Sequence, residues 1–474
     1  MDKQFETLLE NIPAYERFYT LAELDDSSLR LAEAHPDCVK LREVGRTREG
    51  RALLMLSIFC DDPEADNALM LGCPHPNEPI GAMMLEYFSG ALAEDKALRD
   101  RLGYHFHILK VWDADGAVRN EGWFGGPFTI TNYFRHYFRP AGNEQVDWTF
   151  PIRYKKLDID DPLPETKAAM KLIDELKPTF LYTLHNSGFG GAYWYMTRPL
   201  QQLFDPLREV ARKYGIPLHL GEPESRMTQI YAPAFYANLG LANTYDHMEA
   251  AGADMDAFAA SRRSGDSSAG YARTRYGTLT LLTELPYFMD ERIVDATPSK
   301  VTRREAMIER NQKNAARNAE IHRILDPVLP IIGTGDPRVR AVLNFTTPNS
   351  SIAGLDGAYQ REIERPENQR PATVAELFDM RYISMFYKLQ NYGMAMQALN
   401  EIAEGLTGGD AGCSGGDEEK ITAVADARDA MGEAFERLAA ELESNVHYQV
   451  EPIRNLVAVQ LASGLLVADE LKKH

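Results

Sequence analysis

Residues 68–91, ALMLGCPHPNEPIGAMMLEYFSGA, contain in one stretch the features that decide the fold. The apolar run at residues 68–72 is typical of a buried strand, and residues 80–91 have helical character. Between them lies His75-Pro76-Asn77-Glu78, which places an imidazole and a carboxylate one turn apart. Open α/β sheets bind their ligands at this carboxyl end of a strand. The segment therefore predicts an α/β fold with a polar site directly after the strand.

Further apolar runs on both sides of this segment predict the other strands of the sheet. These runs are Leu53–Ile58, Tyr104–Trp112, Thr179–Leu184 and Thr278–Leu285. Stretches of helical period separate them up to about residue 284, which is the rhythm of an α/β domain. We therefore predict a mixed central sheet flanked by helices, with most of these strands in its interior.

After about residue 298 the pattern changes to long helical segments. One helix is predicted to begin at a capping box, Thr373 with Glu376, and to run through Leu389. The clearest helical face repeats every three or four residues, at Val424, Ala427, Met431, Phe435, Leu438 and Leu442. The glycine-rich segment 405–420 is interpreted as a connection between helices. We divide the chain into a catalytic region, residues 1–298, and an additional C-terminal helical region, residues 299–474, of unknown role.

Charge and targeting signals narrow the class of protein. The chain has 70 acidic and 51 basic residues, a net charge of −19 that repels phosphate backbones and anionic lipid. We therefore expect neither nucleic acid nor membrane as a partner. The four cysteines lie far apart, which argues against a disulfide framework or a structural zinc ribbon. Residues 1–14 lack the pattern of a secretory signal, and we predict a cytoplasmic protein.

Two more polar residues follow predicted strands in the way that His75 and Glu78 do. His185 comes directly after one strand and Glu284 ends another. Two imidazoles and one carboxylate, with a fourth position left for water, form the ligand set of a catalytic zinc ion. Glu284 can then take the proton of that water. Taken alone, the His75 and Glu78 pair is equally compatible with a solvated loop and a helix-capping glutamate.

Several shorter motifs accompany these residues. They are Tyr19-Thr20 with Glu23-Leu24, His35-Pro36, VGRTREGRALLML at Val44–Leu56, DADG at Asp113–Gly116, and FRHYFRP at Phe134–Pro140. Together with the polar residues at the strand ends, they resemble the zinc carboxypeptidases of the carboxypeptidase A type. The resemblance covers about residues 15–290 and does not extend to the helical region. It implies a zinc-dependent hydrolase that cleaves a peptide or amide bond.

The resemblance also implies roles for individual residues. His75, Glu78 and His185 match the ligands of one zinc ion, and Glu284 matches the general base. Asp147, in VDWTFP, matches an aspartate that hydrogen-bonds a ligand histidine. Such a carboxylate fixes the histidine tautomer and raises its basicity as a ligand.

An arginine of the family polarises the scissile carbonyl and stabilises the oxyanion. Arg135 matches it, and we take Arg135 as the catalytic arginine. Arg139 and Arg119 lie near Arg135 in the sequence, so either of them could match the family's arginine instead. We take Arg139 as a substrate-binding candidate.

The chain departs from the family where a peptide's terminal carboxylate binds. The family reads Asp-Leu-Asn-Arg-Asn-Phe-Pro where this chain has DWTFP at residues 147–151, so the Asn-Arg pair is missing. The tyrosine that closes over the carboxylate has no counterpart in Phe258–Ser268. We hypothesise that Arg262 or Arg263 replaces this carboxylate clamp, because a guanidinium binds a carboxylate through two hydrogen bonds. A solvated charge pair is the alternative.

Three functions remain compatible with the sequence. The first is a metallocarboxypeptidase that hydrolyses a peptide. The second is a deacylase or amidase for an N-acylated amino acid or small biosynthetic amide, which the missing Asn-Arg pair favours. The third is a non-catalytic ligand-binding module, which the presence of Glu284 argues against. The helical region is a candidate surface for a homo-oligomer.

Overall fold

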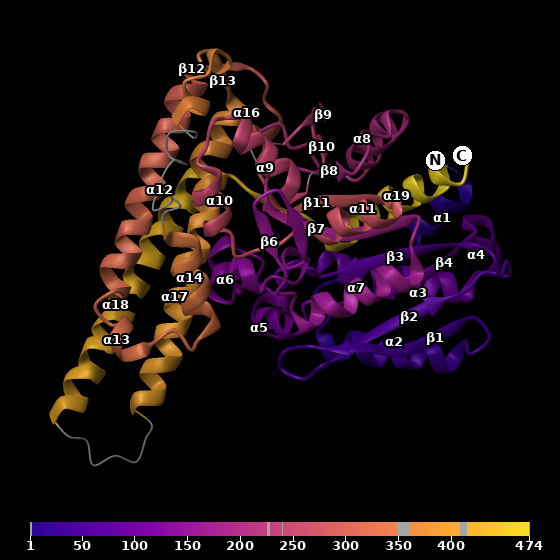
Figure 1. Cartoon of the computed structure of the whole chain (residues 1–474), viewed down its shortest axis with the longest axis horizontal. Coiled ribbons are helices and arrows are strands. Elements are labelled where there is room, and N and C mark those ends of the chain that lie inside the picture. Colours follow the sequence, from indigo (N-terminus) through magenta and orange to yellow (C-terminus); the bar gives the residue numbers. More distant parts are fainter. Residues whose placement is uncertain (1, 225–227, 239, 348–359, 408–414, 474) are drawn as a thin grey trace.

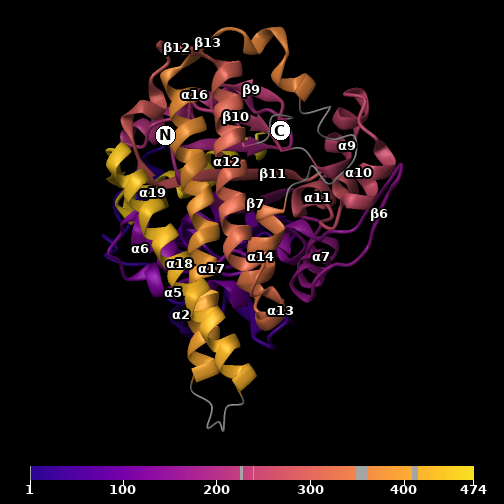
Figure 2. The same cartoon turned by 90° about the vertical axis from the view of Figure 1, so that its left-hand side faces the viewer.

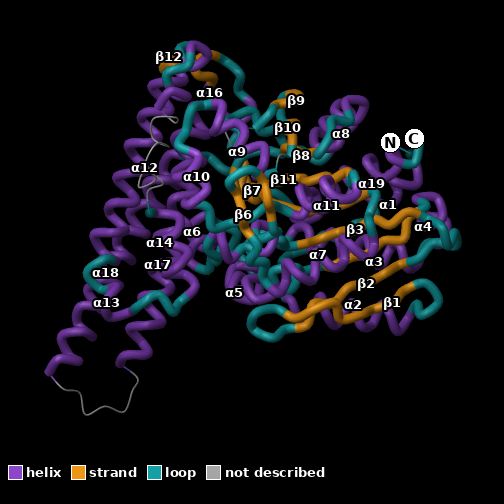
Figure 3. The backbone as a smooth tube through the Cα atoms, in the orientation of Figure 1, coloured by secondary structure: helices purple, strands orange, loops and turns teal. Residues whose placement is uncertain are grey.

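A mixed ten-stranded sheet forms the centre of the computed structural model, which describes residues 2–224, 228–238, 240–347, 360–407 and 415–473 (Figure 1 and Figure 3). Its strand order is β1-β2-β4-β3-β7-β11-β8-β10-β9, and β14 pairs with β11. The strands are β1 Val39–Arg46, β2 Ala52–Ile58, β3 Asp66–Gly72, β4 Tyr104–Leu109, β7 Phe180–Phe189, β8 Tyr193–Met196, β9 Ile230–Ala232, β10 Phe235–Ala237, β11 Leu279–Met289 and β14 Gln449–Val450. Helices flank this sheet, so the predicted fold class is confirmed.

Two small two-stranded sheets and the helices accompany the central sheet. One pairs β5 Ile152–Tyr154 with β6 Leu157–Ile159, and the other pairs β12 Pro298–Thr302 with β13 Pro371–Thr373. The helices up to residue 298 are α1 Lys3–Glu10, α2 Leu21–Ala34, α3 Ile80–Glu94, α4 Lys96–Leu102, α5 Ala114–Phe124, α6 Ile130–Arg135, α7 Pro164–Leu176, α8 Phe204–Lys213, α9 Leu241–Ala250, α10 Met255–Ser261 and α11 Ser268–Tyr276. Those after it are α12 Arg303–Leu325, α13 Leu329–Ile332, α14 Pro337–Thr346, α16 Val374–Phe378, α17 Ser384–Thr407, α18 Gly415–Asn445 and α19 Ile453–Leu471.

The centre of the sheet consists of the strands that the apolar runs predict. β4, β3, β7 and β11 lie side by side and parallel, and β2 joins β4 antiparallel. Side chains alternate between the two faces of a strand. In β2, Leu56 and Ile58 join the core that contains α3 and α19, whereas Leu53 and Met55 join the core beneath α7 and α11. Both faces are therefore buried, which explains why these runs are continuously apolar.

Helix α3 packs closely on β7, and Gly81 permits this contact. A Cβ added at Gly81 would lie 2.5 Å from the Leu184 Cβ, closer than packed carbon atoms come. Gly90 lies later on the same helix and has no atom within 4 Å of the corresponding position. The two glycines therefore offer a matched test of the helix–sheet contact.

We expect Gly81→Ala to lower the free energy of unfolding by about 1–3 kcal/mol, because the added methyl group overpacks the core. Gly90→Ala is expected to raise it by about 0.5–1 kcal/mol, because alanine favours a helix and meets no obstacle here. Urea denaturation of both variants measures the two changes. If Gly81→Ala stabilised the protein as much as Gly90→Ala, the close approach of α3 and β7 would be contradicted.

The C-terminal region begins as a bundle of long helices. α12, α14, α17 and α18 pack against one another at one end of the sheet, and Figure 2 views this bundle from its outer side. The predicted apolar face of α18 is buried from Val424 to Leu442. The helix predicted from the capping box at Thr373 is interrupted, because a π-helical segment, Asp379–Ile383, separates α16 from α17. Residues 408–414 of the glycine-rich connection lie outside the described residues.

Helix α19 leaves this bundle and returns to the sheet. It packs against α3, β7 and β11, and the chain termini lie close together beside it (Figure 1). One continuous core contains residues of α3, α17, α18 and α19, so the division at residue 298 does not separate two cores. Among the described residues, no helix has the length and apolarity needed to cross a membrane.

Candidate active site

The sheet presents His75 and Glu78 in a tight loop between β3 and α3. β3 ends at Gly72, and Cys73 takes a left-handed backbone conformation, with φ of +50°, where the chain turns. The Glu78 backbone N–H donates to the His75 carbonyl at 3.1 Å, and α3 begins two residues later. This turn brings both side chains to the same cavity.

His185 and Glu284 reach the same cavity from neighbouring parallel strands. They are direct partners in the register of β7 and β11, so their side chains project from the same face of the sheet. The prediction that both residues lie where their strands stop is wrong. β7 continues to Phe189 and β11 to Met289, because the pairing resumes after register shifts at Leu285 and Pro286.

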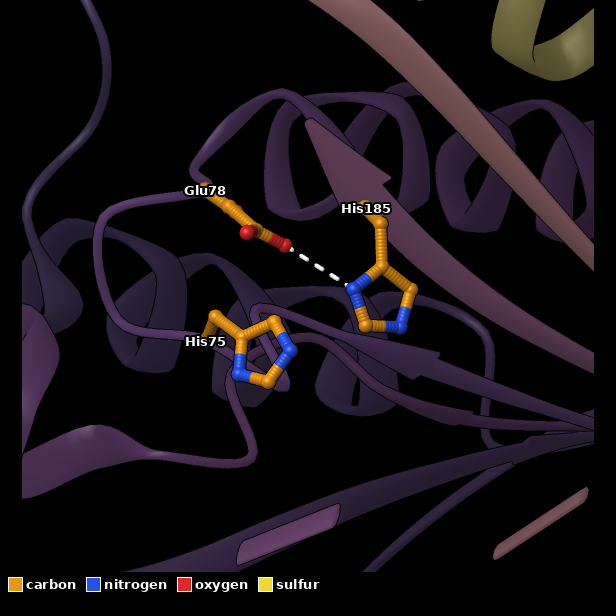
Figure 4. A group of neighbouring side chains, drawn as sticks. All are labelled: His75, Glu78 and His185. Carbon is orange, nitrogen blue, oxygen red and sulfur yellow. Dashed lines mark hydrogen bonds and ion pairs between the residues drawn. The ribbon is translucent and has the colours of Figure 1, made fainter. Parts of the chain in front are cut away.

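His75, Glu78 and His185 form a compact buried group (Figure 4). One nitrogen or oxygen atom from each lies within 4.8 Å of the other two. His185 Nδ1 and Glu78 Oε2 are 3.0 Å apart. His75 Nδ1 and His185 Nε2 are buried and have no hydrogen-bond partner among the described residues. Buried polar atoms are normally satisfied, so these unpaired nitrogens are suited to bind a metal ion, and the donor set fits one zinc ion.

The electrostatics of the cavity also suit a metal and a base. Burial, with the nearby charges of Arg139 and His185, lowers the pKa of His75 well below its usual value, which keeps the ring neutral as a metal ligand must be. Burial, together with the charges of Glu224 and Glu78, raises the pKa of Glu284 well above its usual value. Glu284 Oε2 has no hydrogen-bond partner among the described residues. A buried carboxyl group with a raised pKa is a stronger proton acceptor than an exposed one.

Polar contacts from distant segments fix the position of these residues. The Tyr287 hydroxyl oxygen lies 2.9 Å from the Asn77 carbonyl oxygen and 3.0 Å from Asn186 Oδ1, so its one hydrogen is shared between these two acceptors. The Gln460 side chain, on α19, donates to the His185 carbonyl at 3.0 Å. The loop of His75 and Glu78, the strand β7 and the last helix are therefore held in one network.

The cavity has a volume of about 530 Å³, and the helical region forms part of its wall. Phe386, Tyr387 and Gln390 of α17 line it, and the Tyr387 hydroxyl donates to the Ser187 carbonyl on β7. Sequence reasoning missed these residues, because the apolar spacing of a helix does not identify the surface on which that helix packs.

The two candidate arginines lie in different places. Arg135 does not line the cavity; its side chain is about half exposed and forms an ion pair with Glu436 at 2.5 Å. Arg139 lines the cavity, donates to Glu78 Oε1 at 3.3 Å and to Gln145 Oε1 at 3.1 Å, and lies over the Trp148 ring. Three residues lie between the two arginines. Arg135 ends α6 and Arg139 lies beyond it, so the two side chains have different surroundings.

The two arginines proposed as a carboxylate clamp also lie outside the cavity lining. Arg262 packs over the Phe258 ring, and Arg263 is exposed and donates to backbone carbonyls. The clamp hypothesis is therefore not supported. Asp147 does line the cavity, where its Oδ1 accepts from the Ser268 backbone N–H at 2.7 Å. Its hydrogen bond to a ligand histidine stays a prediction.

One further carboxylate was missed by sequence reasoning. Glu224 lines the cavity and accepts hydrogen bonds from the hydroxyl groups of Tyr193, at 2.9 Å, and Tyr195, at 3.2 Å. No motif surrounds it in the sequence.

Solved structures similar to this chain include carboxypeptidases of low sequence identity. No curated protein matches the chain. A carboxypeptidase A from Helicoverpa armigera is 16% identical, with 60% of this chain and 71% of that chain covered and a TM-score of 0.37. A metallo-carboxypeptidase from Burkholderia cenocepacia is 16% identical, with 56% and 60% covered and a TM-score of 0.33.

The family model of the zinc carboxypeptidases matches residues 27–263, half of the chain. This range contains His75, Glu78 and His185, and it ends before Glu284. The family is one of zinc metallopeptidases that use one zinc ion. The matched half of the chain and the buried ligand group lead to the same conclusion: this chain belongs to the zinc carboxypeptidase family.

Proposed function

We propose that the protein hydrolyses a peptide or amide bond with a zinc ion held by His75, Glu78 and His185. The observation that carries the proposal is the convergence of these three buried side chains next to Glu284. Metal analysis of the purified protein, combined with a cleavage screen over peptides and acylated amino acids, tests it. Protein that binds no zinc and cleaves no amide would overturn it.

The residues of the cavity support a hydrolytic reaction. When bound, zinc supplies Lewis acidity, which lowers the pKa of water towards about 7 and polarises a carbonyl group. Glu284 accepts the proton of the attacking water and returns it to the leaving amine. Its raised pKa suits both steps, because the group must gain and lose a proton in each cycle.

Arg139 is our candidate for stabilising the negative charge that develops on the carbonyl oxygen. Glu78, Gln145 and the Trp148 ring hold its side chain in place. A guanidinium group has five N–H donors, so it can keep these contacts and still donate to an oxyanion.

We expect Arg139→Met to lower kcat/KM by about 10²–10³-fold, the usual effect of removing one oxyanion donor. Arg135→Met removes a guanidinium four residues away, outside the cavity, and is expected to keep activity within about twofold, since surface changes have small effects. Steady-state kinetics of the two variants, both with normal zinc content, measure the contrast. If Arg135→Met lost activity and Arg139→Met did not, Arg135 would be the catalytic arginine.

The substrate is proposed to be a peptide, with a deacylase or amidase as the second candidate. Within the described lining of the cavity, Arg139 is the one guanidinium, so a second arginine to bind a terminal carboxylate is absent there. This observation favours the second candidate. Peptides with free and with amidated C-termini separate the two, because only a carboxypeptidase requires the free carboxylate. A cytoplasmic location and assembly through residues 299–474 stay predictions.

A further inference from the structure

We propose that α17 limits the size of the substrate, because Tyr387 stops a peptide chain from extending along β7 past the metal group. The substrate class that follows is a single acylated amino acid or a peptide of a few residues, not a long polypeptide. The inference rests on the proposed hydrolase function and deepens it by naming a class of substrate. It concerns a helix outside residues 27–263, the range that matches the family model.

β7 has a free edge directly beyond the ligand His185. β3 ends at Gly72, the partner of Leu184, so in the described structure no strand pairs with this edge of β7 from there to Phe189. On the other side, the register with β11 skips Ser187. A free strand edge presents unpaired backbone groups, and extended peptides bind to such edges by adding a strand. A long substrate would therefore find a binding surface here if the edge were open.

Side chains of α17 cover this edge. The Tyr387 hydroxyl donates to the Ser187 carbonyl. Phe386 packs on Gly188, which has a φ of +68°, and a Cβ added there would lie 2.8 Å from the Phe386 ring. The same ring meets that of Phe189 edge-on, with centroids 5.6 Å apart. The backbone positions with which an extended substrate would pair are therefore occupied.

Tyr387 also reaches into the cavity. It lines the cavity together with Glu284, and its side chain is 38% exposed. Burial of its hydroxyl, with the charges of Glu224 and Glu284, raises the pKa of Tyr387 well above its usual value, so the hydroxyl stays a neutral donor. The exposed part of the ring therefore borders the path of a chain that leaves the metal group along β7.

The helix that carries Tyr387 is fixed at several points. Asp379, which precedes α17, has its Oδ2 2.8 Å from His219 Nε2. Gln390 Oε1 accepts from the Tyr137 hydroxyl at 3.0 Å, and the Gln397 side chain donates to the Tyr137 carbonyl at 2.9 Å. A wall held in this way excludes a long chain instead of moving aside. The cavity of about 530 Å³ has the size of a pocket for a small ligand.

The test uses two series of blocked alanine peptides, lengthened from one to four residues on the amino-terminal or the carboxyl-terminal side of the scissile bond. We expect kcat/KM of the zinc-loaded protein to fall by at least about tenfold along one series, because a longer chain must give up one or two hydrogen bonds beside the metal. Tyr387→Ala opens the wall and should reduce this fall to about twofold or less, by raising the activity on the longer peptides. A general loss of structure does not produce such a gain.

Leu406→Ala provides the matched control. Leu406 also lies on α17 and is also 38% exposed, but it is outside the cavity lining, so this variant should keep the full fall. Tyr387→Leu shortens the side chain less severely and should reduce the fall in part. It decides the question if Tyr387→Ala does not fold. Zinc content should be the same in all of these proteins.

Binding of acetyl-Ala-amide and acetyl-(Ala)4-amide gives a readout that does not depend on turnover. Trp148 fluorescence reports it, because Trp148 lines the cavity and is 37% exposed, whereas Trp112, Trp123 and Trp194 are buried.

The outcomes separate the inference from the proposed hydrolase function. Weaker binding of the longer peptide by the unmodified protein, relieved in Tyr387→Ala, supports the inference even if no peptide is cleaved, in which case the hydrolase function alone fails. Cleavage with no fall of kcat/KM along either series overturns the inference and leaves the hydrolase function intact. A fall that persists unchanged in Tyr387→Ala also overturns it.

Discussion

Glu284→Gln is expected to lower kcat by about 10³-fold, within the range that general acid–base catalysis contributes, while the protein keeps its zinc. Glutamine has nearly the shape of glutamate, so the packing of β11 is preserved, but its amide cannot accept the proton of water at neutral pH. Zinc content by elemental analysis and kcat on the best peptide of the screen provide the two measurements. A variant with kcat close to that of the unmodified protein would exclude Glu284 as the base.

A second variant separates loss of the base from a general effect of removing a carboxylate. Glu433→Gln changes an exposed residue of α18 in the same way. Its activity should match that of the unmodified protein. Equal losses in both variants would mean that the assay reports net charge rather than proton transfer.

His185→Ala is expected to release zinc and abolish activity together. Loss of one of three protein ligands leaves too few donors to hold the ion, so zinc content should fall to less than about a tenth and kcat to background. Addition of excess zinc should restore activity only partly. Elemental analysis and kinetics on the same preparation measure both effects.

His105→Ala provides the control for this variant. His105 lies on β4, at the edge of the Phe59 ring, and is not part of the ligand group. It should keep its zinc and its activity. Full zinc content in His185→Ala would contradict the ligand assignment, whatever the activity.

The sequence was sufficient to predict the central strands and the three residues that come together in the cavity. Continuous apolar runs identify strands buried on both faces, and His75, Glu78 and His185 directly follow or continue such runs. The face of α18 was predicted for the same reason, since a period of three to four residues reflects the geometry of a single helix. These features depend on the spacing of neighbouring residues, which can be read directly from the sequence.

Other features depend on how distant segments pack, and these were predicted incorrectly or missed. Arg135 and Arg139 differ in the sequence by one helical turn, and only the end of α6 determines which of them faces the metal group. Glu224 has no surrounding motif, and its place in the cavity depends on hydrogen bonds from Tyr193 and Tyr195 of β8.

The sequence by itself determined the type of fold and the residue types of the buried His75, Glu78 and His185 group, because both follow from residue type and short-range spacing. The tertiary structure alone decided which arginine enters the cavity, that α17 closes one of its walls, and that Gln460 of α19 supports His185. These contacts join residues far apart in the chain. Their formation depends on side-chain direction and close packing in three dimensions, which no local pattern specifies.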